Sequence, residues 1–172
     1  MTKHRISLKE IKIKKGYMPG SIGKISLLHG TYYHENWGFG LFFEAKVATE
    51  LSEFLKRYDE RKDCLLTAVF QKQIEGSVVI DGIHSENKGA HLRWFIVSDR
   101  IRGKGAGNQL IKKAVNFCRE KDYKKIYLWT FKGLDSAQHL YLKHGFGLVE
   151  ERRGSQWGKK VQEQRYELVL KD

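Results

Sequence analysis

The 172-residue sequence contains one proline, two cysteines and no long hydrophobic run. Its longest apolar stretches, such as Trp94–Val97, fall far short of the roughly 18 residues that a membrane-spanning helix needs. Cys64 and Cys118 cannot form the disulfide framework of a small secreted protein, and the basic N-terminus MTKHRISLKEIKIKK has no apolar segment typical of a secretory signal. We therefore expect a cytoplasmic protein that does not enter a membrane.

The motifs of several enzyme classes are absent as well. There is no H-E-x-x-H or C-x-x-C pattern, so no metal site is expected, and no G-x-S-x-G pattern of a serine hydrolase. The P-loop pattern G-x-x-x-x-G-K-[ST] is also missing. A dinucleotide-binding pattern, G-x-G-x-x-G/A, begins at Gly103 but fails at Asn108, where glycine or alanine is required.

Positive charge is what the sequence has in excess. Lys and Arg number 32 against 20 Asp and Glu, which gives a net charge of +12. This excess is typical of proteins that bind nucleic acid, an anionic membrane surface or a polyanionic small ligand. Hydrophobic residues make up 41% of the chain, enough for a packed core. The length and the lack of repeats or linkers predict a single domain over residues 1–172.

Hydrophobic periodicity predicts the element order β-α-α-β-β-β-α-β-α-β-β. Strands are expected at residues 8–14, 65–70, 74–81, 91–97, 125–131, 146–152 and 164–170. Helices are expected at residues 21 to about 32, 41–58, 106–121 and 136–144, with a turn-rich break at 36–40. This order predicts an α+β domain with a mixed, mostly antiparallel, twisted sheet flanked by about four helices. The strands at 91–97 and 125–131 are predicted to be a parallel pair, joined by the helix between them.

The most informative segment is RIRGKGAGNQLI, residues 100–111, which lies between a predicted strand and a predicted helix. Glycines let the backbone turn tightly and approach a ligand. The unpaired N–H groups and the dipole at a helix start attract phosphate, and Arg102 and Lys104 add full charges. The pattern R-x-x-G-x-G, formed by Arg102, Gly105 and Gly107, therefore predicts a phosphate cradle. A solvated turn that only caps the helix is the alternative.

Two blocks of the sequence resemble the GNAT superfamily of N-acetyltransferases. In that family an apolar strand ending in valine and the pattern R-x-x-G-x-G precede a long helix, as residues 92–97 and 102–107 do here. The second block of the family, N-x-x-A-x-x-L-Y-x-K-x-G-F, is matched by Ala137, Leu140, Tyr141, Lys143, Gly145 and Phe146. The resemblance is good over residues 90–150. The N-terminal half, with its YYHENWGFG segment, is similar to the acetyltransferase half of fused MarR-type regulators.

The resemblance implies a GNAT-type domain that binds acetyl-CoA and transfers its acetyl group directly to an amine. Its parallel strands would splay to admit the pantetheine arm, an amide near Phe95 would polarise the thioester carbonyl, and Tyr141 would protonate the departing thiolate. The residues implied at the cofactor are Phe95, Ile96, Val97, Arg102, Gly103, Lys104, Gly105, Ala106, Gly107, Asn108, Ala137 and Lys143.

The sequence departs from the family pattern at two positions. Leu134 stands in place of the asparagine of the second block, and Trp129 stands where some members carry a glutamate base. The proton of the acceptor amine therefore needs another route. Four candidate bases are left unassigned: His91, Glu86, Glu44 and Glu35. The first two helices are implied to wall the acceptor pocket, and Trp37 and Phe39 are expected to face the substrate from a glycine-flanked turn.

Two other functions stay open on the same fold: a non-catalytic acetyl-CoA-binding module and a nucleic-acid-binding module. Basic residues cluster between positions 100 and 125, with aromatic residues nearby, as in proteins that bind single strands. Helix periodicity, however, turns Lys112 and Lys113 toward solvent, and no DNA- or RNA-binding motif is present. The acetyltransferase interpretation is therefore preferred. A homodimer is compatible with it, because dimers are common in the family that the sequence resembles.

Overall fold

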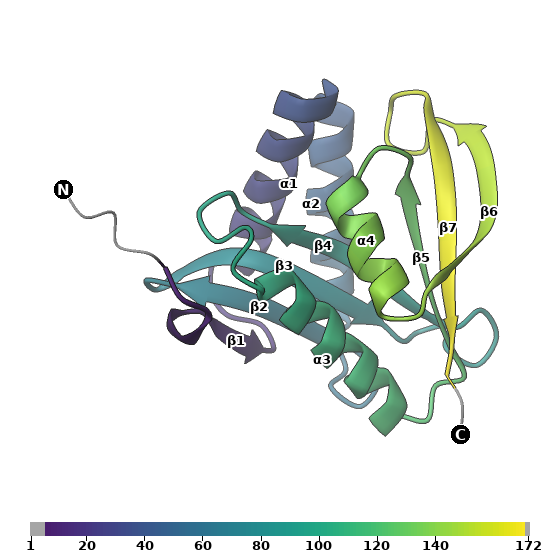
Figure 1. Cartoon of the computed structure of the whole chain (residues 1–172), viewed down its shortest axis with the longest axis horizontal. Helices are drawn as coiled ribbons and strands as arrows, with labels where there is room; N and C mark the ends of the chain where they lie inside the picture. Colours follow the sequence, from purple (N-terminus) through teal and green to yellow (C-terminus); the bar gives the residue numbers. More distant parts are fainter. Residues whose placement is uncertain (1–5, 171–172) are drawn as a thin grey trace.

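The computed structural model describes residues 6–170, in which a seven-stranded sheet carries helices on both faces (Figure 1). A short 3-10 turn, Leu8–Glu10, precedes the first strand. The strands are β1 (Lys12–Lys15), β2 (Cys64–Phe70), β3 (Gln73–Asp81), β4 (Ala90–Val97), β5 (Lys125–Phe131), β6 (Gly147–Gly154) and β7 (Val161–Val169). The helices are α1 (Ser21–Trp37), α2 (Leu41–Lys56), α3 (Ala106–Glu120) and α4 (Asp135–Lys143).

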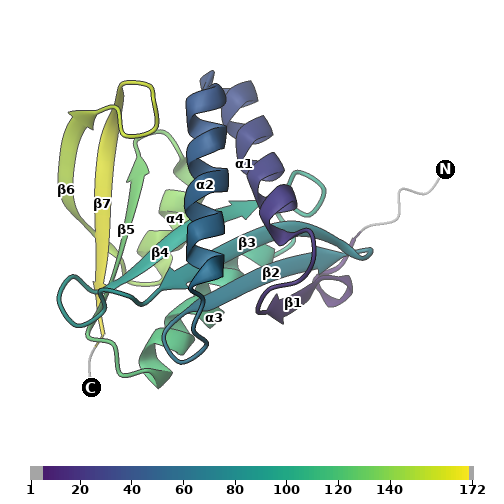
Figure 2. The same ribbon diagram turned by 180° about the vertical axis from the view of Figure 1, so that it is seen from behind.

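The strands are ordered β1-β2-β3-β4-β5-β7-β6 across the sheet. Every neighbouring pair is antiparallel except β4 and β5, which are parallel and joined through α3. Helices α3 and α4 cover the face seen in Figure 1, and α1 and α2 cover the opposite face seen in Figure 2. The predicted α+β class, mixed sheet and parallel pair are confirmed. Of the predicted domain, residues 1–5 and 171–172 lie outside the described part.

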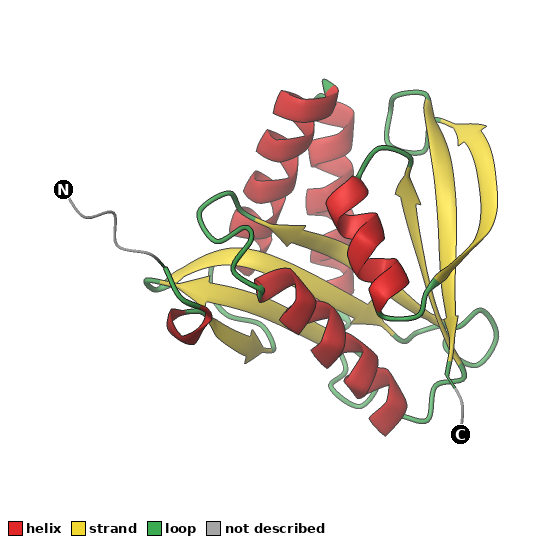
Figure 3. Ribbon diagram, in the orientation of Figure 1, coloured by secondary structure: helices red, strands yellow, loops and turns green. Residues whose placement is uncertain are grey.

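Separate hydrophobic clusters form on the two faces of the sheet, which Figure 3 shows as a layer between pairs of helices. All seven residues of β2 are buried, as expected of a strand covered on both sides. Alternate β2 side chains point to opposite faces: Leu66 packs with α3 residues such as Leu110, whereas Leu65 packs with Ile25 and Leu51 from α1 and α2. This one strand therefore contributes side chains to both hydrophobic clusters.

Three predicted boundaries were wrong by three residues or more, and one of them is the start of β7, which lies at Val161 rather than at residue 164. The predicted strand at 8–14 begins with a 3-10 turn, because the Ser7 N–H donates to the Glu10 carboxylate (2.8 Å) and closes a capping box. Helix α1 continues to Trp37 instead of ending near residue 32. Gly30 is tolerated inside α1 because the Glu44 side chain of α2 packs against it, where a Cβ atom would lie 3.0 Å from Glu44 Cδ.

Both cysteines are buried and unpaired, and burial raises the pKa of the Cys64 thiol to about 11. Over residues 6–170, no helix combines the length and the apolar character needed to cross a bilayer.

Two glycines give a matched test of the packing. At Gly82, just after β3, a Cβ atom would lie 2.2 Å from the Lys62 carbonyl oxygen, whereas at Gly23 on α1 it would meet nothing within 4 Å. We expect Gly82→Ala to lower the stability by about 2–3 kcal/mol through overpacking, or roughly 5–10 °C in Tm. Gly23→Ala is expected to raise it by about 0.5 kcal/mol. Thermal unfolding measures both, and equal effects would contradict this packing.

Candidate active site

The centre of the site is the place where β4 and β5 separate. Only Ala90 with Ile126 and His91 with Tyr127 pair in parallel, and beyond them the two strands diverge (Figure 1). A cavity of about 1040 Å³ opens along this gap. The splayed pair expected from the sequence is therefore present. Backbone groups of β4 that point toward β5 have no strand partner beyond His91 in the described chain, and an extended ligand could pair with them.

A β-bulge in β4 lies beside this gap. Ser77 of β3 pairs with Ile96 and Val79 pairs with Arg93, so that Trp94 and Phe95 together oppose a single β3 residue. Trp94 adopts a left-handed φ of 46°, and its carbonyl accepts a hydrogen bond from the Ser77 hydroxyl (2.6 Å). This conformation is strained for a bulky residue, and the bulge re-aims the backbone of Phe95.

The glycine-rich loop lies at one end of the cavity. Gly103 and Gly105 have φ values of 73° and 90°, and Gly105 forms the N-cap of α3 without any side-chain cap. The first amides of α3 are therefore left for a ligand, together with the positive end of the helix dipole. Arg102 donates to the Val97 carbonyl (3.0 Å), pairs with Asp99 (2.7 Å) and lies over the Tyr32 ring.

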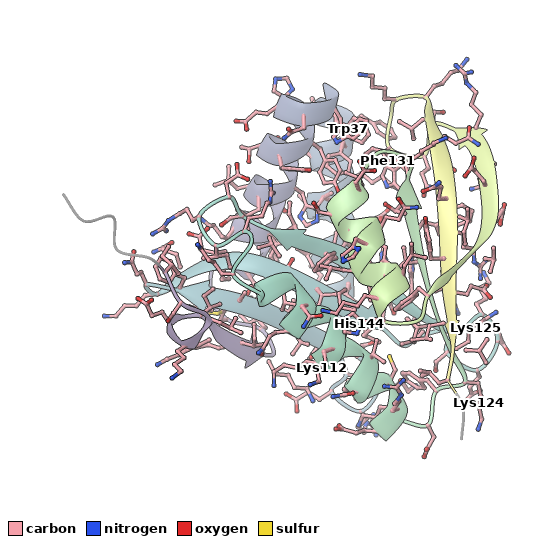
Figure 4. All side chains as sticks on the ribbon, in the orientation of Figure 1. Trp37, Lys112, Lys124, Lys125, Phe131 and His144 are labelled. Carbon is pink, nitrogen blue, oxygen red and sulfur yellow. The ribbon has the colours of Figure 1, made fainter. Side chains whose placement is uncertain are left out.

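Most of the predicted cofactor residues line the cavity. These are Phe95, Ile96, Val97, Arg102, Gly103, Gly105, Gly107, Asn108 and Ala137. Three others do not: Ala106 is buried in the core, Lys143 is exposed on α4, and Lys104 is partly exposed in the loop. A hydrogen bond also joins the first turn of α3 to the end of α4, because His144 Nε2 donates to Asn108 Oδ1 (2.8 Å). Figure 4 shows His144 and Lys112 near the junction of α3 and α4.

Tyr141 also lines the cavity, and it is almost completely buried, with 5% of its surface exposed. Its ring packs against Phe95, Phe146 and Tyr166, each about 6.0 Å away between centroids. Burial raises the pKa of the Tyr141 phenol far above its usual range, and the neighbouring Tyr33 and Tyr166 add to this. The phenol therefore stays protonated at neutral pH and can act as a proton donor.

The two residues expected to face the acceptor are not on the cavity wall. Phe39 has only 2% of its surface exposed, and Trp37 is the last residue of α1 rather than part of a turn. Both rings pack against Phe131, at 5.4 and 4.9 Å, and Figure 4 shows Trp37 next to Phe131. Phe131 does line the cavity. Trp37 and Phe39 thus support the wall from behind.

Of the four candidate bases, His91 lines the cavity, whereas Glu35, Glu44 and Glu86 do not. Burial, together with the nearby charges of Arg93 and Arg165, lowers the pKa of His91 to about 3. The His91 ring stacks on Tyr127 (4.4 Å). This pair stands at the closed end of the gap, where β4 and β5 are still hydrogen-bonded.

The sequence interpretation missed the polar residues that α1 and α2 contribute to the cavity. His29, Lys46 and Glu50 line it, and Glu50 forms ion pairs with Lys46 (2.5 Å) and with Arg93. Glu50 follows the buried Phe43 by seven positions, so helical periodicity places it on the inner face of α2. The aromatic residue Trp157, from the loop between β6 and β7, completes the wall on that side.

Comparison with known proteins places this site in a family. The sequence matches the acetyltransferase (GNAT) family over residues 28–146, which is more than half of the chain. The sequence is 25% identical to human N-acetyltransferase 8B over 126 residues, or 71% of this chain and 56% of that protein. The chain therefore spans about half the length of this curated relative.

Solved structures share the fold. A GNAT-family acetyltransferase from Staphylococcus aureus Mu50 has a TM-score of 0.74 and 20% identity, covering 94% of this chain and 99% of that one. A GNAT acetyltransferase from Elizabethkingia anophelis, solved with acetyl-CoA bound, has a TM-score of 0.66 and 17% identity with the same coverage. The chain belongs to the acetyltransferase (GNAT) family, and membership supports acetyl transfer from acetyl-CoA at the level of the family.

The glycine loop can be tested with two glycines of equal φ. Gly105 and Gly16 both have φ near 90°, but only Gly105 lines the cavity. Alanine at either position strains the backbone, so we expect each variant to lose about 1–2 kcal/mol of stability. Gly105→Ala should in addition weaken acetyl-CoA binding roughly tenfold, since the α3 amides lose their alignment. Titration calorimetry compares the two, and equal affinities would exclude the loop as the cradle.

Proposed function

We propose that the protein is an N-acetyltransferase that moves the acetyl group of acetyl-CoA directly to a primary amine of a small-molecule or protein acceptor. The observation that supports this most is the cavity along the β4–β5 gap, because it joins the glycine loop at one end to the Tyr141 phenol. A polyanionic cofactor with a long neutral arm suits a cradle of amides followed by an unpaired strand edge.

In the proposed complex, the α3 amides and the loop bind the pyrophosphate, and β4 pairs with the pantetheine arm. Arg102 supplies charge beside the loop, and Lys104 and Lys143 contact phosphate groups from outside the cavity. Arg102 now bonds to the Val97 carbonyl, which lies on the edge expected to pair with the arm. Binding therefore exchanges an internal hydrogen bond for one to the cofactor.

The proposed reaction proceeds by direct attack. The neutral amine nitrogen bonds to the thioester carbon, and the carbonyl oxygen gains negative charge in a tetrahedral intermediate. A backbone amide at Phe95, re-aimed by the bulge, stabilises that charge. The C–S bond then breaks, and the phenol of Tyr141 gives its proton to the thiolate. Burial raises the pKa of the Tyr141 phenol and makes it a weaker acid, so the proton transfer is proposed to be concerted with cleavage of the C–S bond.

The acceptor is proposed to enter on the side of α1 and α2. There the cavity is lined by aromatic rings, including Tyr33, Trp129 and Trp157, and by the ion-paired Glu50. Trp37 and Phe39 shape this wall through Phe131. An amine attached to an apolar or aromatic body would bury its surface against these rings.

Two measurements test the proposed function. Acetyl-CoA at a hundred times its Kd should stabilise the protein by about 2.7 kcal/mol and raise Tm by roughly 5–10 °C. Release of free CoA thiol should then depend on both the enzyme and an amine drawn from a panel of amino acids, polyamines, aromatic amines and peptides. A thermal shift without release from any amine would indicate a cofactor-binding module, and no shift at millimolar acetyl-CoA would exclude both.

We expect Tyr141→Phe to lower kcat about 100-fold, because the thiolate then leaves unprotonated. The phenyl ring preserves the packing against Phe95 and Phe146, so the Kd for acetyl-CoA should change less than twofold. Tyr17→Phe, at an exposed tyrosine outside the cavity, serves as the control. Steady-state CoA release and calorimetry give the two quantities. An unchanged kcat would remove Tyr141 from the mechanism.

A further inference from the structure

A buried histidine on the wall of the cavity has no role in the reaction described so far. His29 lies on α1, lines the cavity and has only 4% of its surface exposed. Its ring is held by a hydrogen bond from Nδ1 to the Ile25 carbonyl (2.8 Å) and stacks near Tyr33 (6.2 Å). The ring orientation is thus fixed by one polar and one aromatic contact.

The hydrogen bond determines where the ring carries its proton. A carbonyl oxygen can only accept, so Nδ1 must be the protonated nitrogen. Burial lowers the pKa of His29 to about 4, and the ring is therefore neutral at physiological pH. It follows that Nε2 has a free lone pair. No other group among residues 6–170 forms a hydrogen bond to Nε2, so its lone pair is available to a molecule in the cavity.

Neighbouring contacts place His29 beside the bulge of β4. Ile25, one helical turn before it, belongs to the hydrophobic cluster against which Trp94 packs. Tyr33, one turn after it, packs with a second cluster that Trp94 also touches. His29 therefore lies on the stretch of α1 that passes over Trp94. The proposed thioester carbonyl sits at the next residue, Phe95.

We infer that His29 is the general base of the reaction and takes the proton of the acceptor amine on Nε2. The inference rests on the proposed acetyl transfer. As the C–N bond forms, the amine nitrogen becomes positively charged and acidic, and its proton passes to Nε2. The C–S bond breaks, Tyr141 protonates the thiolate, and the proton on His29 returns through water to the Tyr141 phenolate. The enzyme ends in its starting state.

The other titratable groups of the cavity are less suited to this role. The carboxylate of Glu50 is already bound by Lys46 and Arg93, so both cations would have to be displaced before it accepted a proton. His91 stands at the closed end of the gap and is stacked on Tyr127. His139 is exposed on α4, on the opposite face of the sheet from the proposed acceptor entry. His29 is the buried imidazole next to the bulge.

The variant His29→Asn distinguishes the role of Nδ1, which bonds to the Ile25 carbonyl, from that of Nε2. An asparagine on this helix can donate its Nδ2 to the carbonyl four residues earlier, as Asn36 does to Tyr32 (2.9 Å). His29→Asn thus keeps the bond to Ile25 and removes Nε2. We expect kcat to fall about 100-fold, while the KM for acetyl-CoA and the Tm stay near wild type. The matched control is His34→Asn, since His34 also bonds through Nδ1 to a carbonyl (Phe39, 2.9 Å) but does not line the cavity.

A second variant tests base strength and does not depend on an exact fit of asparagine. His29→Ala leaves a space into which imidazole can diffuse. Added imidazole should raise the kcat of this variant at least tenfold. Pyrazole has the same shape but is a much weaker base, so it should restore less than twofold. Equal rescue by the two compounds would show that His29 only fills space and would overturn the inference.

The wild-type rate distinguishes failure of this inference from failure of the proposed function. If the wild-type enzyme releases CoA with no amine in the panel, the acetyltransferase proposal fails and His29 has no reaction to serve. If the wild type is active, Tyr141→Phe is slow and His29→Asn retains more than half of the wild-type kcat, then only the assignment of His29 is wrong.

Discussion

The separation of β4 from β5 is the constraint on which the rest of the structure depends. Two paired positions hold the strands together at one end, and the bulge at Trp94 turns β4 away from its neighbour. Unpaired peptide groups in a protein interior are costly, so such a gap persists only where surrounding elements hold it open. Here α4 inserts the Tyr141 ring from one face, against Phe95, and α1 and α2 pack over the other face. The edge of β4 is left for a ligand.

Burial acts by the same physical cause on the proposed proton donor and on the proposed base. Removing a side chain from water disfavours its charged form, whatever the sign of the charge. Tyr141 is therefore kept as a neutral phenol that carries a proton, and His29 as a neutral imidazole with a lone pair on one ring nitrogen. Neither needs an ion-pair partner. Glu50 differs, because it is ion-paired with Lys46 and Arg93.

Local patterns in the sequence predicted much of the fold and one half of the site. The glycine loop, the parallel strand pair and the position of Tyr141 follow from residues that are close together in the chain. The contributions of α1 and α2 could not be predicted in this way. Whether Trp37 and Phe39 face the cavity or support Phe131 depends on where α1 ends. Helix α1 ends at Gly38, whose left-handed φ of 67° forms the C-cap, and it continues through Gly30, where α2 packs closely. His29 gave no signal, because a single histidine on an apolar helix face has no motif.

The fold shows where some of the basic residues behind the net positive charge lie. Arg102 lies at the glycine loop. Burial lowers the pKa of His144, and the nearby charges of Lys143, Lys112 and Arg119 contribute to this. Lys112, Lys143 and Arg119 do not line the cavity, whereas Arg102 does.

Strand β6 differs from the rest of the sheet, because seven of its eight residues are exposed and the eighth is half-buried. It is held by its ladder with β7 and by side-chain contacts such as Arg152 with Glu163 (2.9 Å), with little apolar burial. Such an element opens locally at a small fraction of the free energy that unfolds the whole domain. The loop that follows β6 carries Gln156 and Trp157 into the cavity wall. One wall of the cavity is thus attached to an edge strand with little apolar burial, whereas the glycine loop leads into α3, whose inner face is buried in the core.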